Sequence, residues 1–257
     1  MRIVIKIGTS TLCHTSGRLN IRRVEELCKA ISDLKNSGHE VILVSSGAIA
    51  MGTGKLSLRE KPADIPGKQA AAAVGQCELM YVYDKLFSEY NHVVAQLLMT
   101  GSDFDNEERH ANFTNTMGRL LELGVLPVLN ENDTVSTAEI KVGDNDTLSA
   151  LAAVSVNADL LVLLSDIDGL YTADPHTDPD AELIAEVREL TPEIMELGGG
   201  AGSKLGTGGM KTKLSAAKLC MEAGCDTVIA NGNTPALLYD VCEGKAVGTR
   251  FYKKAER

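Results

Sequence analysis

The sequence predicts an α/β protein with an open, mainly parallel sheet and helices on both faces, a three-layer αβα sandwich. Short apolar segments alternate along the chain with segments whose apolar residues recur at helical spacing. The strand segments are apolar throughout, which is typical of strands buried on both faces. Polar, glycine-bearing segments follow nearly every strand. Because ligands of open α/β sheets bind beside the carboxyl ends of the strands, these segments predict one shared site.

The expected elements follow one another along the whole chain. The first strand covers Arg2–Ile7, and the first helix has Asn20 as its N-cap and Gly38 as its C-cap glycine. The other elements are strands over 41–44, 93–98, 125–129, 160–164 and 227–230, and helices over 68–90, 105–123, 148–156 and 211–223. We further expect a small hairpin over 135–142 and a surface loop over 174–182, which is acidic and contains two prolines.

Composition excludes several classes of protein. The 257 residues include 25 Lys and Arg against 35 Asp and Glu, a formal charge of −10, which argues against binding a nucleic-acid backbone. A hydrophobic share of 44% excludes a disordered chain. The sequence has no apolar run long enough for a membrane helix and no signal-peptide pattern, so we expect a cytoplasmic location. The six cysteines form no C-x-x-C pair and have no histidines at metal spacing, so we expect no metal site.

Lys6 is the first candidate for an anion-binding residue. It lies between Ile5 and Ile7 at the end of a buried strand, where a lysine is costly unless an anion meets it. Gly8, Thr9 and Ser10 follow and offer backbone N–H groups and hydroxyls that can hold phosphate. The alternative is a lysine on an edge strand that reaches solvent.

Residues 206–213 give a second phosphate signal. The segment Gly-Thr-Gly-Gly-Met-Lys-Thr-Lys leads into a helical pattern, so that N–H groups and the positive end of the helix dipole are available to a phosphate. Lys213 falls in the first helical turn, where a cation opposes the dipole, and this position favours a role in ligand binding. A mobile glycine loop is the alternative, because glycines are also dense over 198–202.

Better-known nucleotide motifs are absent. The chain contains no G-x-x-x-x-G-K-[ST] segment, no G-x-G-x-x-G after a strand, and none of the protein-kinase signatures. Any use of a nucleotide must therefore come from another fold.

Polar clusters follow three further strands. They are the segment 143–147, with the sequence Gly-Asp-Asn-Asp-Thr, the segment 130–133, with Asn-Glu-Asn-Asp, and the pair Ser165 and Asp166. Each cluster alone could be an ordinary helix cap or turn. Their common position after successive strands favours a shared ligand-binding site.

Taken together, these segments resemble the glutamate 5-kinases of the amino-acid kinase fold family. The similarity runs from Lys6 to about Phe251 and so covers essentially the whole chain. It rests on residues 5–10, 45–50, 68–76, 130–133, 140–146, 169–175 and 206–213. The segments 46–50 and 142–146 are more specific to this branch than the others.

The resemblance implies a role for each matching residue. Lys6, Asp146 and Lys213 would be catalytic, with Lys6 on the ATP phosphates, Lys213 near the phosphoryl group in transfer and Asp146 organising both lysines. Ser46, Asp133 and Asn145 would hold glutamate. The residues that would bind ATP besides Lys6 are Ser165, Asp166, Thr207, Gly208, Gly209, Met210, Lys211, Thr212 and Lys213.

The resemblance also implies a reaction and its partners. The γ-carboxylate of L-glutamate would attack the γ-phosphorus of ATP, with Mg²⁺ as cofactor, in the first step of proline biosynthesis. Proline as a feedback inhibitor, a reductase that captures the product and a homo-oligomer are further expectations. Many relatives continue into a PUA domain, whereas this sequence ends at Arg257. We therefore expect a single kinase domain over residues 1–257.

Other functions stay open at this point. A kinase of the same fold could act on acetylglutamate, aspartate or a nucleoside monophosphate. A catalytically inactive amino-acid sensor would be expected to lack Lys6, Asp146 or Lys213, and all three are present. An RNA-binding protein is disfavoured by the acidic charge and by the absence of the C-terminal module.

Overall fold

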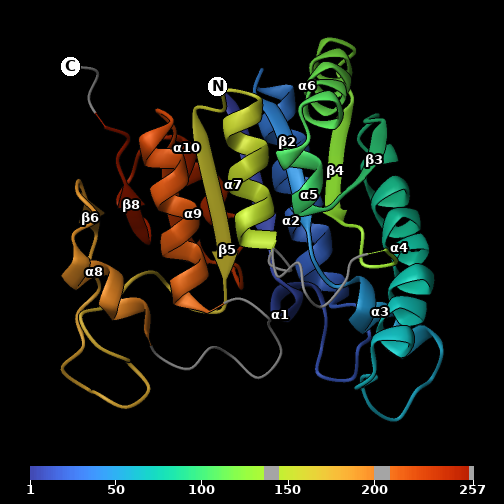
Figure 1. Ribbon diagram of the computed structural model, residues 1–257, viewed down its shortest axis with the longest axis horizontal. Helices are drawn as coiled ribbons and strands as arrows, with labels where there is room; N and C mark the ends of the chain where they lie inside the picture. The colour runs from blue at the N-terminus through green and yellow to red at the C-terminus, as the bar shows by residue number, and fades with distance from the viewer. Residues whose placement is uncertain (136–144, 200–208, 255–257) are drawn as a thin grey trace.

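The computed structural model describes residues 1–135, 145–199 and 209–254. Within these residues, eight strands form a single sheet with the order β3-β4-β2-β1-β5-β7-β8-β6 (Figure 1). The strands are β1 (Arg2–Ile7), β2 (Glu40–Ser45), β3 (Val94–Met99), β4 (Leu126–Glu131), β5 (Leu160–Ser165), β6 (Glu186–Val187), β7 (Asp226–Asn231) and β8 (Thr249–Phe251). The five strands predicted after Arg2–Ile7 are confirmed, each one or two residues longer or shifted by one residue.

Strand pairing is parallel except between β7 and β8. β1 lies at the centre between β2 and β5, so that Lys6 is in register with Val44 and Leu163. The central position excludes the alternative of an edge-strand lysine. The carboxyl ends of β1, β2, β4 and β5 therefore meet at one edge of the sheet.

Helices cover both faces of the sheet, which confirms the three-layer prediction. One hydrophobic cluster joins the sheet to α2, α4 and α10, and a second joins the opposite face to α6, α7 and α9. The helices are α1 (Thr9–Leu12), α2 (Ile21–Asn36), α3 (Ala48–Lys55), α4 (Ile65–Ser88), α5 (Gly101–Asp105), α6 (Glu107–Glu122), α7 (Asn145–Ser155), α8 (Pro192–Glu196), α9 (Met210–Glu222) and α10 (Leu237–Cys242), with a 3₁₀ turn at Leu197–Gly199. Every helix within the described ranges is too short or too polar to cross a bilayer.

The ends of α2 follow the predicted capping residues. The side chain of Asn20 accepts a hydrogen bond from the backbone N–H of Arg23 and so satisfies a free donor of the first turn. Ser37 is the C-cap, and Gly38 follows it with φ of 89°, a left-handed conformation that glycine adopts without strain.

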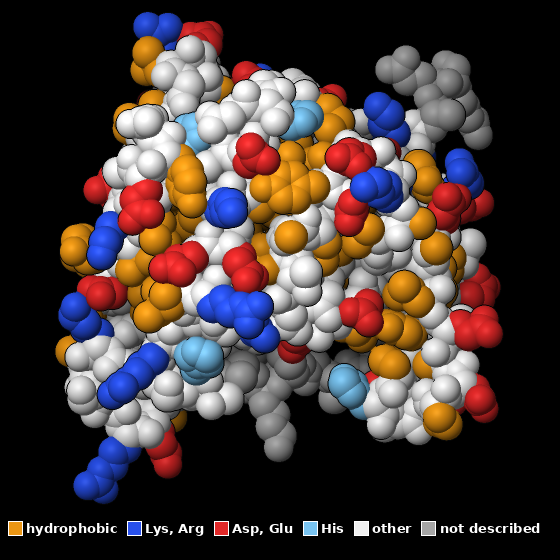
Figure 2. Space-filling view, turned by 180° about the vertical axis from the view of Figure 1, so that it is seen from behind, with side chains coloured by type: hydrophobic (Ala, Val, Ile, Leu, Met, Phe, Trp, Pro, Cys, Tyr) orange, Lys and Arg blue, Asp and Glu red, His pale blue; other side chains and the backbone are white. Residues whose placement is uncertain are grey.

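Two predicted segments are not comparable with the structure in full. Most of the hairpin expected over 135–142 lies outside the described residues, as do residues 206–208 of the glycine-rich segment. The acidic segment 174–182 has no helix or strand and is largely exposed, as predicted. On the face seen in Figure 2, acidic and basic side chains are interspersed rather than gathered into a basic patch.

The backbones of α3 and α4 touch through two glycines. A Cβ atom on Gly52 would lie 1.8 Å from the carbonyl oxygen of Ala71, and one on Gly75 would lie 1.8 Å from the carbonyl oxygen of Ala48. No side chain fits at either position. This contact fixes the start of α3, whose N-cap Gly47 directly follows Ser46 and has φ of 98°.

We expect Gly75→Ala to destabilise the fold by about 1–3 kcal/mol, because the backbone of α3 would have to move. The measurement is the free energy of unfolding in urea. The matched control is Gly118→Ala in the interior of α6, where a Cβ atom meets nothing within 4 Å. This control is expected to stabilise the protein by up to about 1 kcal/mol, since alanine is the better helix former. Equal stability of the two variants would contradict the close packing of α3 against α4.

Candidate functional site

Three charged side chains from distant parts of the chain meet at the carboxyl edge of the sheet. Lys6 Nζ lies 2.6 Å from Asp146 Oδ1, and Lys213 Nζ lies 3.2 Å from Asp146 Oδ2. The side chains of Lys6, Asp146 and Lys213 are 8%, 0% and 7% exposed. The carboxylate is therefore held between two buried ammonium groups.

Each member of this cluster comes from a different element. Lys6 is at the end of β1, Asp146 is the second residue of α7, and Lys213 is the fourth residue of α9. The hydroxyl of Thr212 also donates to Asp146 Oδ2 at 2.8 Å. One carboxylate cannot neutralise two ammonium groups, so these three side chains keep an excess positive charge that suits an anion.

The pKa of Asp146 reflects this setting. Burial raises the pKa of a carboxyl group, but here Lys6 and Lys213 favour the ionised form more strongly, and the pKa of Asp146 falls below its usual 3.8. The hydrogen bond from Thr212 acts in the same direction. The carboxylate therefore stays charged and keeps both lysines in place.

The residues predicted to bind a nucleotide lie at the end of β5 and at the start of α9 where the structure describes them. Ser165 ends β5, and its hydroxyl donates to the Asp166 carboxylate at 3.2 Å. Gly209 is the N-cap of α9, whose first residues are Met210, Lys211 and Thr212. Thr207 and Gly208 lie outside the described residues.

A cavity of about 250 Å³ lies next to the charged cluster. Its lining includes all three residues that were predicted to hold an amino acid: Ser46, Asp133 and Asn145. Asn145 Nδ2 donates to Ser46 Oγ at 2.9 Å, which joins α7 to the end of β2. Since Asn145 directly precedes Asp146, the cavity and the charged cluster are neighbours.

His14, Arg59, Lys61, Asn130 and Glu131 also line this cavity. The sequence did not single out the first three of these residues. Arg59 and Lys61 are exposed residues of the loop between α3 and α4, and nothing in the local pattern distinguishes them from ordinary loop charges. Asn130 and Glu131 belong to a cluster that the sequence did single out, but without a role for either residue. The cavity thus offers cationic groups besides the carboxylate of Asp133.

Asp133 has an altered acidity. Burial raises its pKa above the usual 3.8, and the positive charge of Lys61 opposes part of this rise. A partly buried carboxylate of this kind is stabilised by a bound cation.

The described residues do not form a metal cage of their own. They contain no group of three His, Cys, Asp or Glu side chains that could hold a metal ion. Mg²⁺ commonly keeps several waters and is held through substrate phosphates, so a magnesium ion bound to a nucleotide needs no such cage.

Comparison with known sequences gives consistent matches. Residues 1–231 match the family described as "Amino acid kinase family". A glutamate 5-kinase of Clostridium perfringens is 53% identical over 257 residues, which cover 98% of this chain and 96% of the relative. The glutamate 5-kinase of Listeria innocua is 52% identical over 99% of this chain and 94% of its own length. That of Caldanaerobacter subterraneus is also 52% identical, but only 68% of its length is covered.

Solved structures match over nearly the whole chain at low sequence identity. A UMP kinase from Bacillus anthracis has a TM-score of 0.67 at 15% identity and covers 99% of this chain and 96% of its own. A carbamate kinase from Giardia lamblia, bound to AMP-PNP, has a TM-score of 0.68 at 17% identity and covers 98% of both chains. At these identities the match shows a common fold.

We expect Asp146 to stabilise the protein in a pH-dependent way. Because its pKa is lower in the folded state, its contribution is complete above the unfolded pKa of about 3.9 and is lost as pH falls through the folded pKa. Wild type should therefore lose more stability than Asp146→Asn between about pH 4 and pH 2. At pH 7, Asp146→Ala should cost about 3–5 kcal/mol, because two buried ammonium groups lose their partner.

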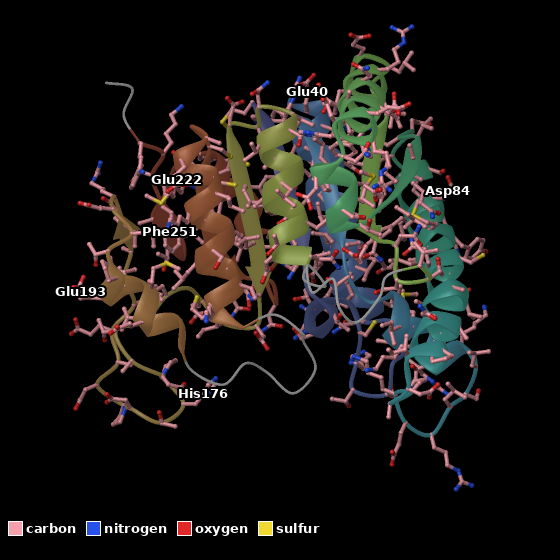
Figure 3. The ribbon with its side chains drawn as sticks, in the orientation of Figure 1. Glu40, Asp84, His176, Glu193, Glu222 and Phe251 are labelled. Carbon is pink, nitrogen blue, oxygen red and sulfur yellow. The ribbon has the colours of Figure 1, made fainter. Side chains whose placement is uncertain are left out.

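The measurement is the free energy of unfolding at a series of pH values. Asp84→Asn is the control, since Asp84 is exposed on the outer side of α4, away from the cluster (Figure 3). Asp84→Asn should follow the wild-type curve, and an Asp146→Asn curve parallel to that of wild type would contradict the assignment.

Proposed function

The chain belongs to the amino acid kinase family, and from this premise we propose that it transfers the γ-phosphoryl group of MgATP to the side-chain carboxylate of L-glutamate. The observation that carries the proposal is the position of the Lys6–Asp146–Lys213 cluster beside a cavity of amino-acid size. About 50% identity to glutamate 5-kinases over nearly the whole chain supports the choice of acceptor.

The acceptor needs no general base. A side-chain carboxyl group with a pKa of about 4.3 is already ionised at neutral pH and can act as the nucleophile. Attack of a carboxylate oxygen on the γ-phosphorus gives an acyl phosphate and ADP. A site built from lysines and carboxylates suits this chemistry.

The principal requirement of this reaction is that the site balances the negative charge of both substrates. A carboxylate and a triphosphate repel each other, and charge spreads over the transferring group in the transition state. In this proposal Lys6 and Lys213 bind phosphoryl oxygens, and their ion pairs with Asp146 support the view that the carboxylate fixes the position of both ammonium groups. Mg²⁺ would arrive on the nucleotide and withdraw charge from its phosphate oxygens.

The cavity supplies groups for both ends of the amino acid. Asp133 offers a carboxylate to the α-ammonium group, and Ser46 and Asn145 offer a hydroxyl and an amide. Arg59 and Lys61 in the same lining offer cations to the α-carboxylate. The γ-carboxylate is then free to point towards the lysine cluster.

Wider roles follow from the same reaction. The proposal places the protein in the cytoplasm at the first step of proline biosynthesis, with proline as a feedback inhibitor. An acyl phosphate reacts readily with water, so a reductase partner that captures it is part of the proposal, as is a homo-oligomer. The single domain over residues 1–257 stays a prediction.

We expect Lys6→Ala and Lys213→Ala to lower kcat by about 10²–10³, equivalent to about 3–4 kcal/mol of transition-state stabilisation. The KM for L-glutamate should change little, since both lysines act on the phosphoryl group. Steady-state ADP release measures both constants. Lys218→Ala, an exposed position on the same helix α9, is the control and should match wild type. Wild-type turnover in a folded Lys6→Ala or Lys213→Ala protein would refute the assignment.

A substrate panel tests the choice of acceptor. At fixed MgATP, L-glutamate should support acyl phosphate formation, detected as the hydroxamate, at a rate well above that with aspartate, acetylglutamate or UMP. If the protein preferred any of these three compounds to L-glutamate, the proposed substrate would be wrong. The protein would still be a kinase of the same family.

We expect the KM for L-glutamate to rise as pH falls through the raised pKa of Asp133, because the neutral carboxyl group no longer attracts the ammonium group. Asp133→Asn should raise KM about 10- to 100-fold at neutral pH, as the loss of a charge-assisted hydrogen bond does. The Asp133→Asn substitution should also make the KM for L-glutamate less dependent on pH. The pH profile of kcat/KM measures both effects, and a profile unchanged in Asp133→Asn would exclude this role.

A further inference from the structure

A chain of side-chain amides connects the interior of α4 to the cavity. Asn130 Nδ2 donates to Gln76 Oε1 at 2.8 Å, and Asn145 Nδ2 donates to Asn130 Oδ1 at 3.1 Å and to Ser46 Oγ at 2.9 Å. Asn130, Asn145 and Ser46 line the cavity, whereas Gln76 does not. Gln76 thus touches the cavity only through its neighbours.

A backbone N–H identifies the orientation of all three amides. The N–H of Glu131 donates to Asn130 Oδ1 at 2.9 Å, and a backbone N–H can only donate. The oxygen of Asn130 must therefore face Glu131 and Asn145, and its nitrogen must face Gln76. It follows that Gln76 presents its oxygen to Asn130, and that Asn145 presents its nitrogen.

This orientation leaves an acceptor on Asn145. Its Nδ2 is directed to the Ser45 carbonyl, Ser46 Oγ and Asn130 Oδ1. Its Oδ1 is buried and makes no hydrogen bond within the described part of the chain. Asn145 and Asp133 both belong to the lining of the cavity. An amide oxygen without a partner in the described ranges and a carboxylate suit an ammonium group rather than a second carboxylate.

Gln76 is an unusual residue for its position. It lies on the buried side of α4 near the small side chains of Ala71 and Ala72, and it is 8% exposed. Its Nε2 is buried and has no hydrogen-bond partner among the described residues. Gln76 thus pairs the buried donor of Asn130 while leaving a buried donor of its own unpaired among the residues that the structure describes, which is an uncommon arrangement in a helix interior.

We propose that Gln76 is a positioning residue for substrate recognition: by accepting from Asn130 it holds the amide chain in the orientation that presents Asn145 Oδ1 to the α-ammonium group of the bound amino acid. This inference rests on the proposed function and extends it from the lining of the cavity to a residue behind it. Gln76 touches no substrate and acts through Asn130 and Asn145.

The test compares L-glutamate with glutarate, which has both carboxylates but no amino group. Affinities of the full-length protein for both ligands are measured by calorimetry, together with kcat and KM for L-glutamate. Gln76→Met removes the acceptor at nearly the same size, and Gln76→Glu keeps an acceptor. Leu79→Ala, a buried change one turn further along α4, controls for lost packing.

We expect Gln76→Met to lower the preference for L-glutamate over glutarate by roughly tenfold, as the loss of one hydrogen bond to a charged group does. Gln76→Glu and Leu79→Ala should keep the wild-type preference. If Gln76→Met weakens the binding of both ligands equally, so that the preference for L-glutamate over glutarate is unchanged, Gln76 has only a structural role and the inference fails. A wild-type protein that neither binds nor phosphorylates L-glutamate would instead overturn the proposed function, and the inference with it.

Discussion

The carboxylate of Asp146 holds together the part of the molecule on which the chemistry depends. It joins β1, α7 and α9 by pairing with Lys6 and Lys213, and burial makes each of these ion pairs matter more than it would at the surface. Because one carboxylate meets two ammonium groups, the cluster keeps an excess positive charge. Such a cluster is costly in an isolated fold, and a bound phosphate lowers that cost.

The neighbouring cavity is built on a different physical basis. Its wall consists of amides and hydroxyls whose orientation follows from hydrogen bonds, above all the N–H of Glu131 to Asn130. The close contact of α3 and α4 at Gly52 and Gly75 fixes the position of Ser46 at the same wall. The site thus separates a cationic part, suited to phosphoryl oxygens, from a polar part, suited to an amino acid.

The long elements were predictable because each buries a continuous apolar surface with a clear period. The sequence did not predict β6 and β8, which have two and three residues and are too short to show a period. It also missed α3, whose sequence contains Gly52 and Gly54 and favours a helix poorly. Packing against α4 stabilises α3, and Gly52 allows that packing. The same glycine lowers the helix propensity of the segment, which is why the sequence did not predict the helix.

The sequence by itself determined the residue types at three kinds of position: a lysine near the end of a buried strand, a lysine in the first turn of a helix, and polar clusters after other strands. Only the tertiary structure decided that residues 6, 146 and 213 meet within hydrogen-bonding distance, and that Arg59, Lys61 and the amide chain from Gln76 belong to the same site. The reason is physical: local patterns report which face of an element is buried. Contacts between distant residues depend on strand register and helix packing, which arise only when the whole chain folds.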